Sequence, residues 1–179
     1  MIALEFDRRT FLTAGAALAG LAIFNSKGAK AETLAAPMTT TTDTSIDYKK
    51  LTAAEWQKRL TPEQFYVLRK HGTERAGTSP LNKEKRAGTF ACAGCDLPLF
   101  DASTKFESGT GWPSFYQPLS NAVGETTDKS FFMTRTEVHC GRCDGHLGHV
   151  FNDGPKPTGL RYCMNGVAMT FAPAAGSAS

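Results

Sequence analysis

The hydrophobic residues of this chain follow one pattern before Gly88 and another after it. After Gly88, short runs rich in β-branched and aromatic residues alternate with stretches rich in Gly, Pro, Asn and Asp. Such runs predict short strands joined by turns. No helical segments alternate with them, so we expect a mainly β domain with antiparallel sheets. The expected strands are TFACA, FFMTRTEVHC, HVF and RYCMNGVAMTF, and the turns include GTGWP and NDGPKP.

The segment before Gly88 predicts two short helices. LTAAEWQKRL and TPEQFYVLRKHG each contain a Thr followed three residues later by Glu or Gln, the spacing of a capping box. Pro62 stands at the favoured first helical position, and Gly72 is placed to end the second helix. The expected fold is therefore β-rich with a short N-terminal helical segment.

The last predicted strand carries an unusual cysteine. Alternate residues of a strand share a face, so Arg161, Cys163 and Asn165 are expected on one side. Tyr162 and Met164 then point to the other side. An inert core cysteine more often lies among apolar neighbours. Cys163 is therefore a candidate reactive thiol.

The first 31 residues have the pattern of an export signal. Residues 7–12 read DRRTFL and precede the apolar run at 13–24. An arginine pair before such a run is typical of twin-arginine export, and the run is shorter than the roughly 20 residues that span a bilayer. Ala29 and Ala31 form an A-x-A cleavage cue, so we expect cleavage after Ala31 and a periplasmic protein. An uncleaved anchor or a chance arginine pair is the alternative.

Beyond residue 31 we expect three regions. Residues 32–47, rich in Thr and Ala, are predicted to be a flexible linker. The folded domain is expected over 48–173 and a loose tail over 174–179. No stable membrane association is expected after cleavage.

The charge balance gives no support for nucleic-acid binding. The whole chain has a formal net charge of +3. Loss of residues 1–31 removes four basic and two acidic residues, which leaves +1. Nucleic-acid binding normally needs a clustered basic face.

Four of the five cysteines form two C-x-x-C pairs separated by 44 residues. Two such pairs can supply the four thiolates of a tetrahedral, structural Zn²⁺ site. Two disulfides are the alternative, because an export signal leads to an oxidising compartment. A protein exported already folded could bind zinc before oxidation competes. A thioredoxin-like redox pair is less consistent, because neither pair lies in a βαβ pattern. The expected zinc ligands are Cys92, Cys95, Cys140 and Cys143.

Several residues could support chemistry at the remaining thiol. His146 and His149 are three residues apart, and with Arg161 they could favour the thiolate of Cys163 and donate to a substrate oxygen. Structural hydrogen bonding is the alternative for each histidine. The H-x-x-H pair is not expected to bind metal, because no carboxylate stands at a suitable spacing. Trp112 lies in a glycine-rich loop and is expected either to line an apolar pocket or to pack in the core.

CAGC, SGTGWPSFYQPL, CGRCDGHLGHVFNDGPKPTGLRYCMNG and the following VAMTF resemble, in order and spacing, the B-type methionine sulfoxide reductases. The resemblance covers roughly residues 50 to 172. It implies two antiparallel sheets, a structural zinc opposite the active site, and reduction of the R epimer of methionine sulfoxide in oxidised proteins. The implied role is repair of oxidative damage.

The resemblance also implies a role for each matching residue. Cys163 is similar to the nucleophile, and His146, His149 and Asn165 to the groups that bind and protonate the sulfoxide oxygen. Trp112 is similar to the platform for the substrate's methyl group. Arg161 is similar to a support for the thiolate. The product would be methionine and a cysteine sulfenic acid.

Two positions depart from the family pattern. Many members carry a resolving cysteine where this chain has Thr110, so an external thiol is expected to recycle the sulfenic acid. A thioredoxin-like protein facing the periplasm is the expected donor. Met164 stands where a branched aliphatic residue is common, and it is expected to pack away from the site. We also expect a monomer.

Two other classes of function share some of these features. A zinc-stabilised binding module for oxidised proteins would have the same fold and pocket but no need of a free thiol beside Asn165. A general thiol–disulfide oxidoreductase would use the C-x-x-C pairs, which predicts labile cysteines without zinc.

Overall fold

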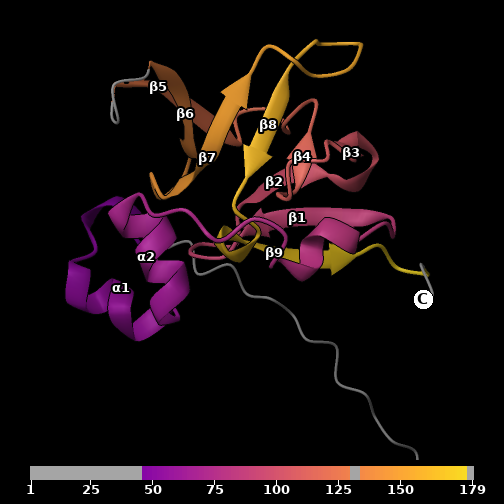
Figure 1. The fold of residues 1–179 in the computed structure, drawn as a ribbon. Coiled ribbons are helices and arrows are strands. Elements are labelled where there is room, and N and C mark those ends of the chain that lie inside the picture. Colours follow the sequence, from indigo (N-terminus) through magenta and orange to yellow (C-terminus); the bar gives the residue numbers. More distant parts are fainter. Residues whose placement is uncertain (1–45, 130–133, 177–179) are drawn as a thin grey trace, which may run out of the picture. The chain divides into compact units, whose positions relative to one another are not determined.

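Figure 1 shows the computed structural model, which describes residues 46–129 and 134–176. The expected export signal and the linker up to residue 45 lie outside the described residues, as do residues 177–179. Within the described ranges, no helix is long and apolar enough to cross a membrane.

The predicted helices are present. Helices α1 (Ala53–Arg59) and α2 (Pro62–Lys70) each begin with a complete capping box, supplied by Thr52 and Thr61 respectively. Pro62 occupies the first turn of α2 as expected. α2 ends at Lys70, and its C-cap is His71 rather than Gly72, because His71 itself adopts the left-handed conformation with φ 54°. Short 3-10 turns lie at Tyr48–Lys50, Pro80–Lys83 and Ala102–Thr104.

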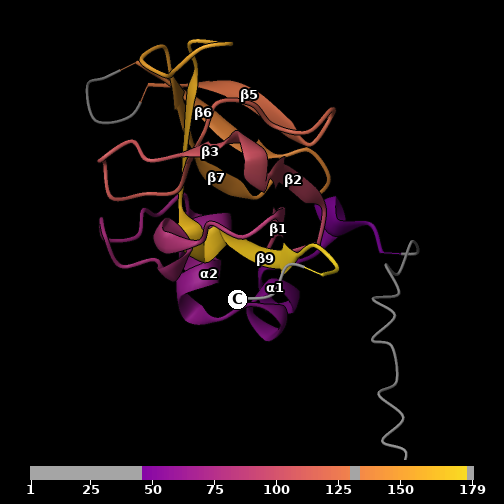
Figure 2. The same ribbon diagram turned by 90° about the vertical axis from the view of Figure 1, so that its right-hand side faces the viewer.

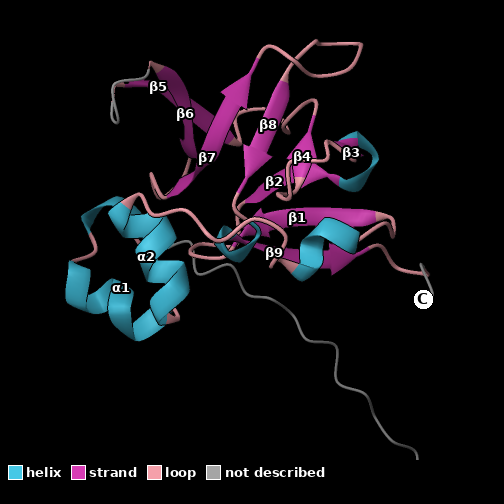
Figure 3. Cartoon of the chain, in the orientation of Figure 1, coloured by secondary structure: helices cyan, strands magenta, loops and turns pink. Residues whose placement is uncertain are grey.

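The strands form two antiparallel sheets, as the resemblance implies (Figures 1 and 3). The smaller sheet has the order β2-β1-β9, and the larger has the order β3-β4-β8-β7-β6-β5. In Figures 1 and 2, strands β1 and β9 of the smaller sheet lie below the long strands β5 to β8 of the larger sheet. The strands are β1 (Gly88–Cys92), β2 (Pro98–Asp101), β3 (Lys105–Phe106), β4 (Ser114–Phe115), β5 (Val123–Asp128), β6 (Arg135–Cys140), β7 (His146–Phe151), β8 (Arg161–Met164) and β9 (Met169–Pro173).

The run RYCMNGVAMTF is not one strand. It divides into β8 and β9, which belong to different sheets and are separated by the 3-10 turn η5 (Gly166–Ala168). Arg161 and Cys163 do lie on β8, but Asn165 lies beyond its end. The hydrophobic pattern could not show this break, because both halves of the run are apolar. The strands β2, β3, β4 and β5 were also not expected, since they are short or largely polar.

Aromatic side chains join the two sheets. Phe115 of β4 stacks on Phe100 of β2 with ring centroids 4.3 Å apart, and it meets Phe90 of β1 edge-on at 4.9 Å. All three rings are fully buried. Tyr162 and Met164 are also buried, on the face of β8 opposite to Cys163, as strand alternation and the expected packing of Met164 require.

Candidate functional site

The four paired cysteines lie on two turns of the same geometry. In each turn the first cysteine's carbonyl accepts from the N–H of an aspartate four residues on, Asp96 or Asp144, at 2.9 Å. Each aspartate has a φ of 56°. One turn follows β1 and the other follows β6, so the strands bring together segments that are far apart in sequence.

The four sulfurs form one compact, buried cluster. Cys92 Sγ lies 3.7 Å from Cys143 Sγ, and Cys95 Sγ lies 3.5 Å from Cys140 Sγ. All four ligand atoms lie within 4.8 Å of one another. Zn–S bonds of about 2.3 Å in a tetrahedron put the sulfurs about 3.8 Å apart, whereas a disulfide bond is about 2.05 Å long. The cluster therefore fits one tetrahedral metal ion and does not have the geometry of two disulfides.

The fifth cysteine lies in a row of polar side chains across the larger sheet. The strand register pairs Ser114 with Cys163, Cys163 with His149, His149 with Glu137, and Glu137 with Thr126. Residues that are directly paired share a face of the sheet. The thiol is thus held between a serine and a histidine on the face opposite to buried Tyr162.

Hydroxyl groups approach the thiol from the glycine-rich loop. Ser108 Oγ lies 2.7 Å from Ser114 Oγ and 2.8 Å from Thr110 Oγ1. Thr110 Oγ1 lies 3.7 Å from Cys163 Sγ, within hydrogen-bonding range for sulfur. This chain of hydroxyls connects the strand β4 to the thiol.

Two carboxylates hold the two histidines, although no carboxylate stands at a suitable sequence spacing from the H-x-x-H pair. His149 Nε2 lies 2.9 Å from Asp128 Oδ2, which Arg135 also contacts at 2.7 Å. His146 Nδ1 lies 2.7 Å from Glu137 Oε1. Both carboxylates come from β5 and β6 and not from positions near the H-x-x-H motif. Sequence spacing therefore gave no sign of them.

A β-bulge brings the two histidines to one face. The β6–β7 register shifts so that Leu147 has no directly opposite residue. Residues three apart on a regular strand point to opposite faces. The extra residue instead lets the rings of His146 and His149 meet edge-on with centroids 5.4 Å apart.

His146 is buried, and its partner Glu137 is largely so. Burial lowers the pKa of His146, although its hydrogen bond to Glu137 opposes this effect. Burial works to raise the pKa of Glu137, but the hydrogen bond from His146 holds it below its usual value. His146 is thus neutral at pH 7, with the carboxylate ionised beside it. His71 Nδ1 also lies 3.0 Å from Glu137 Oε1, so these three side chains could hold a metal. The hydrogen bond of His146 and the ion pair of His71 to the same carboxylate account for the cluster without one.

Asn165 and Trp112 are both held by the loop after α2. Asn165 Oδ1 accepts from the N–H of Glu74 at 2.9 Å, and its Nδ2 donates to Leu147 O at 3.0 Å. Trp112 Nε1 donates to the carbonyl of Glu74 at 3.2 Å. Trp112 is only partly buried, which fits a pocket wall better than core packing.

Arg161 lies beside the thiol with its charge already paired. Its guanidinium donates two hydrogen bonds of 2.8 Å to Asp153 and lies 4.3 Å from the ring centroid of Phe151. The hydrogen bond to Asp153 raises the pKa of Arg161, and the negative charge of a Cys163 thiolate raises it further. The guanidinium itself does not line the cavity that contains Cys163.

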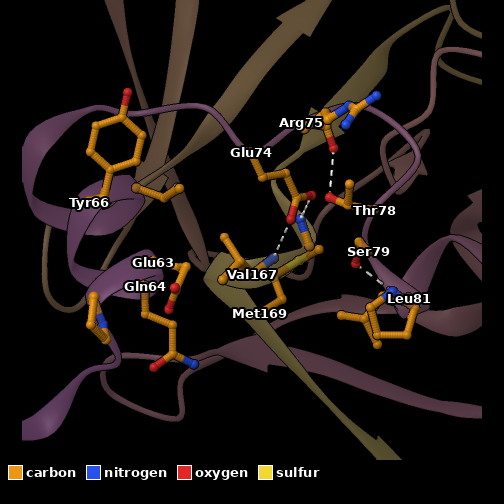
Figure 4. A pocket seen from close by; sticks show the side chains of 14 residues that line it. Glu63, Gln64, Tyr66, Glu74, Arg75, Thr78, Ser79, Leu81, Val167 and Met169 are labelled. Atoms are coloured by element: carbon orange, nitrogen blue, oxygen red, sulfur yellow. Dashed lines mark hydrogen bonds between the residues drawn. The ribbon is translucent and has the colours of Figure 1, made fainter.

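These side chains surround a cavity of about 130 Å³. It brings together four of the predicted residues, and it leaves out two others, His146 and Arg161. A larger groove of about 720 Å³, lined by α2, the Pro80–Lys83 turn and η5, is apolar and does not contain the thiol (Figure 4). We place the site at the smaller cavity, because the reactive groups converge there. It is lined by Thr73, Trp112, Arg135, Gly148, His149, Phe151, Cys163 and Asn165.

The arrangement suits nucleophilic attack on a small polar group attached to an apolar one. The cavity offers a thiol, a histidine held by a carboxylate, a side-chain amide and an aromatic wall. A thiol nucleophile beside a histidine can attack an electrophilic atom while the histidine supplies a proton. Of the groups that take part, Asp128, Arg135, Glu137 and Glu74 were missed by the sequence reasoning.

Comparison with known proteins agrees with this chemistry. The SelR domain matches residues 60–173. A peptide methionine sulfoxide reductase MsrB of Pseudomonas putida (strain W619) is 59% identical over 127 residues, which cover 70% of this chain and 96% of that protein. An MsrB of Agrobacterium fabrum is 54% identical over 67% of this chain and 90% of its own length. The chloroplastic peptide methionine sulfoxide reductase B1 of Arabidopsis thaliana is 56% identical over 69% of this chain, which spans 61% of that longer protein.

Proposed function

The chain belongs to the SelR-domain family, and from this premise we propose that it is a peptide-methionine (R)-S-oxide reductase that repairs oxidised proteins. The observation that carries the proposal is the cavity in which Cys163, His149, Asn165 and Trp112 converge. Nothing in that cavity favours a binding module without turnover, which would not need a thiol there.

The reduction begins with attack of the Cys163 sulfur on the sulfoxide sulfur. The substrate's methyl group packs against Trp112, which directs the sulfoxide oxygen towards His149 and Asn165. As the new S–S bond forms, the oxygen accepts a proton and then transfers to the cysteine. The products are methionine and a Cys163 sulfenic acid, so the sulfoxide is reduced by two electrons and the thiol is oxidised by two.

The two histidines have different roles in this proposal. His149 lines the cavity and acts as the proton donor, oriented by Asp128 at 2.9 Å. His146 lies behind it, neutral and held by Glu137 at 2.7 Å. His146 therefore supports His149 and the buried side of the sheet rather than contacting substrate.

The metal is proposed to be one structural Zn²⁺ ion. Sulfur separations of 3.5 and 3.7 Å fit tetrahedral Zn–S₄ coordination by Cys92, Cys95, Cys140 and Cys143. Four thiolates leave no open position on the metal. When bound, zinc would cross-link the turn after β1 to the turn after β6 and so tie the two sheets together.

Regeneration is proposed to need an external thiol. Thr110 Oγ1 lies 3.7 Å from the Cys163 sulfur, and the four remaining cysteines lie together in the buried cluster. An external thiol would form a mixed disulfide with Cys163, which a second thiol then releases. A thioredoxin-like protein suits this chemistry because it supplies both thiols.

Export to the periplasm by the twin-arginine route is a further part of the proposal. Its support is the Arg8–Arg9 pair before the apolar run, with cleavage expected after Ala31. Replacement of both arginines by lysine should leave an uncleaved precursor in the cytoplasm. Normal processing of this variant, read by N-terminal sequencing, would point to the general secretory route instead.

The activity is tested with separated R and S epimers of a methionine sulfoxide peptide, using dithiothreitol as reductant. The R epimer should be reduced and the S epimer left intact, because only one epimer can present both its methyl group to Trp112 and its oxygen to His149. Equal rates for the two epimers, or no turnover of either, would refute the proposed function.

A further inference from the structure

We propose that Glu74 is a positioning residue for the thiol site: it fixes Asn165 and Trp112 through its main chain and clamps the turn after Cys163 through its carboxylate. The roles of Asn165 and Trp112 in binding substrate are those of the proposed function, so this inference rests on it. Glu74 lies in the loop after α2, outside the cavity that holds the thiol.

The main chain of Glu74 reaches two separate elements of the site. Its N–H donates to Asn165 Oδ1 at 2.9 Å, and its carbonyl accepts from Trp112 Nε1 at 3.2 Å. Asn165 follows β8, whereas Trp112 precedes β4. One residue therefore sets the separation between the amide that meets the sulfoxide oxygen and the ring that meets the methyl group.

The side chain of Glu74 takes over a capping role that Asn165 leaves open. Asn165 is the N-cap residue of η5, but its side chain makes no capping hydrogen bond. The first N–H groups of the turn, those of Gly166 and Val167, instead donate to the two carboxylate oxygens of Glu74, with the Val167 bond at 3.0 Å. First-turn N–H groups need acceptors. Because Glu74 supplies them here, the Asn165 side chain bonds instead to the Glu74 N–H and the Leu147 carbonyl, and it lines the thiol cavity.

Figure 4 shows this arrangement from the side of the large groove. The Glu74 carboxylate reaches across to the turn that carries Val167, and Glu74 lines the groove, not the thiol cavity. The turn is closely packed: a Cβ atom at Gly166 would lie 1.9 Å from Ser79 Oγ. A substitution at Glu74 thus changes the support of the site without changing any group that lines it.

Two hydrogen bonds from adjacent N–H groups to a carboxylate are both charge-assisted and hold the turn at two points. Loss of the two hydrogen bonds from Gly166 and Val167 to the Glu74 carboxylate would allow the turn and Asn165 to move relative to Trp112. A misplacement of about 1 Å near reacting groups can cost about a hundredfold in rate. The expected result is an activity defect in a folded protein.

The test compares Glu74→Gln with Glu63→Gln in the full zinc-loaded chain. Glutamine keeps the size of the side chain but places an NH₂ group against one of the two N–H groups. Glu63 lines the same groove, and its substitution makes the same charge change. We expect kcat/KM on the R-sulfoxide peptide to fall about ten- to a hundredfold for Glu74→Gln and to stay within about twofold for Glu63→Gln.

An independent readout follows the indole N–H signals of Trp56 and Trp112 by ¹⁵N NMR. Glu74→Gln should shift the Trp112 signal and leave that of Trp56, which is buried in α1, in place. This measurement requires no turnover. Failure of the proposed function, seen as an inactive wild type, is therefore distinguishable from failure of the positioning role.

A double-mutant cycle separates positioning from general stability. If Glu74 acts through Asn165, Glu74→Gln should cost much less in kcat/KM when Asn165→Ala is already present. Additive losses, a shift of both indole signals, or wild-type activity in Glu74→Gln would each overturn the proposal. If Glu74→Gln does not fold, Glu74→Asp, whose carboxylate is one methylene further from the turn, is tested against the same outcomes.

Discussion

Thr110 and Cys163 face each other across the site, with Oγ1 and Sγ 3.7 Å apart. The Thr110 hydroxyl also lies 2.8 Å from Ser108, so its side chain is held towards the sulfur. A cysteine at this position would have its sulfur within reach of Cys163. The loop is therefore shaped for a resolving thiol, and in this chain a hydroxyl takes that place.

Thr110→Cys should convert the reaction to one with an intramolecular disulfide. After one equivalent of R-sulfoxide without reductant, the new thiol should condense with the Cys163 sulfenic acid, because the two side chains are in contact. Non-reducing peptide mapping should find a bond between positions 110 and 163 in the variant only. In wild type, a disulfide between Cys163 and a cysteine of the buried cluster would show that the cluster is the resolving partner.

Cys140→Ser should lose metal and structure together, since a structural site contributes its binding free energy to folding. The physical reason is that Cys140 shares the buried cluster with Cys95 at 3.5 Å and closes the turn after β6. Zinc content by atomic spectroscopy and thermal unfolding measure the two effects. Cys163→Ser is the matched control and should keep about one zinc per chain. A folded, metal-free wild type with two disulfides would contradict the assignment.

His149→Ala and Asn165→Ala should each slow the sulfoxide step by about 10²–10⁴, the range for loss of a general acid or of an equivalent oxygen contact. Both side chains line the cavity with the thiol. Single-turnover methionine formation is the measurement. His139→Ala serves as control, because His139 packs against Gly124 of β5 and does not line the cavity. Unchanged rates in His149→Ala would remove the histidine from the mechanism.

Stability should fall on mild acidification, and His146 should contribute to that fall. Its folded-state pKa is lowered by burial, so the folded protein binds a proton less readily than the unfolded chain. The contribution is present above the unfolded pKa of about 6.5 and is lost as the pH falls through the folded value. Between about pH 7.5 and about pH 5.5, the free energy of unfolding measured with urea should decrease less for His146→Asn than for wild type. An identical decrease in the free energy of unfolding for wild type and His146→Asn would contradict a contribution from His146.

Local sequence signals predicted the parts of the fold that local interactions determine. The capping boxes of Thr52 and Thr61 predicted where the helices begin, and the two C-x-x-C pairs predicted the cysteine cluster that could hold a metal ion. The resemblance pointed to the cavity residues Cys163 and Trp112. These features depend on residues within a few positions of each other, or on motifs long enough to identify a family.

The supporting contacts could not be predicted, because tertiary structure creates them. Asp128 meets His149 only because β5, β6 and β7 are adjacent, and Glu74 meets Asn165 across 91 residues. The bulge at Leu147 depends on the register of β6 against β7, which no residue pattern reveals. The break between β8 and β9 similarly depends on the two sheets packing together.

The proposed chemistry at Cys163 is tested most directly by one single-turnover experiment without reductant. Zinc-loaded wild type is mixed with an excess of R-sulfoxide peptide and a sulfenic-acid trap, and both methionine and modified cysteines are quantified by mass spectrometry. We predict about one methionine per chain, since each chain carries one reactive thiol, with the trap on Cys163 and the four cluster cysteines unmodified. Cys163→Ser should form no methionine. Methionine formation by that variant, or a trapped sulfenic acid on any cysteine other than Cys163, would contradict the mechanism.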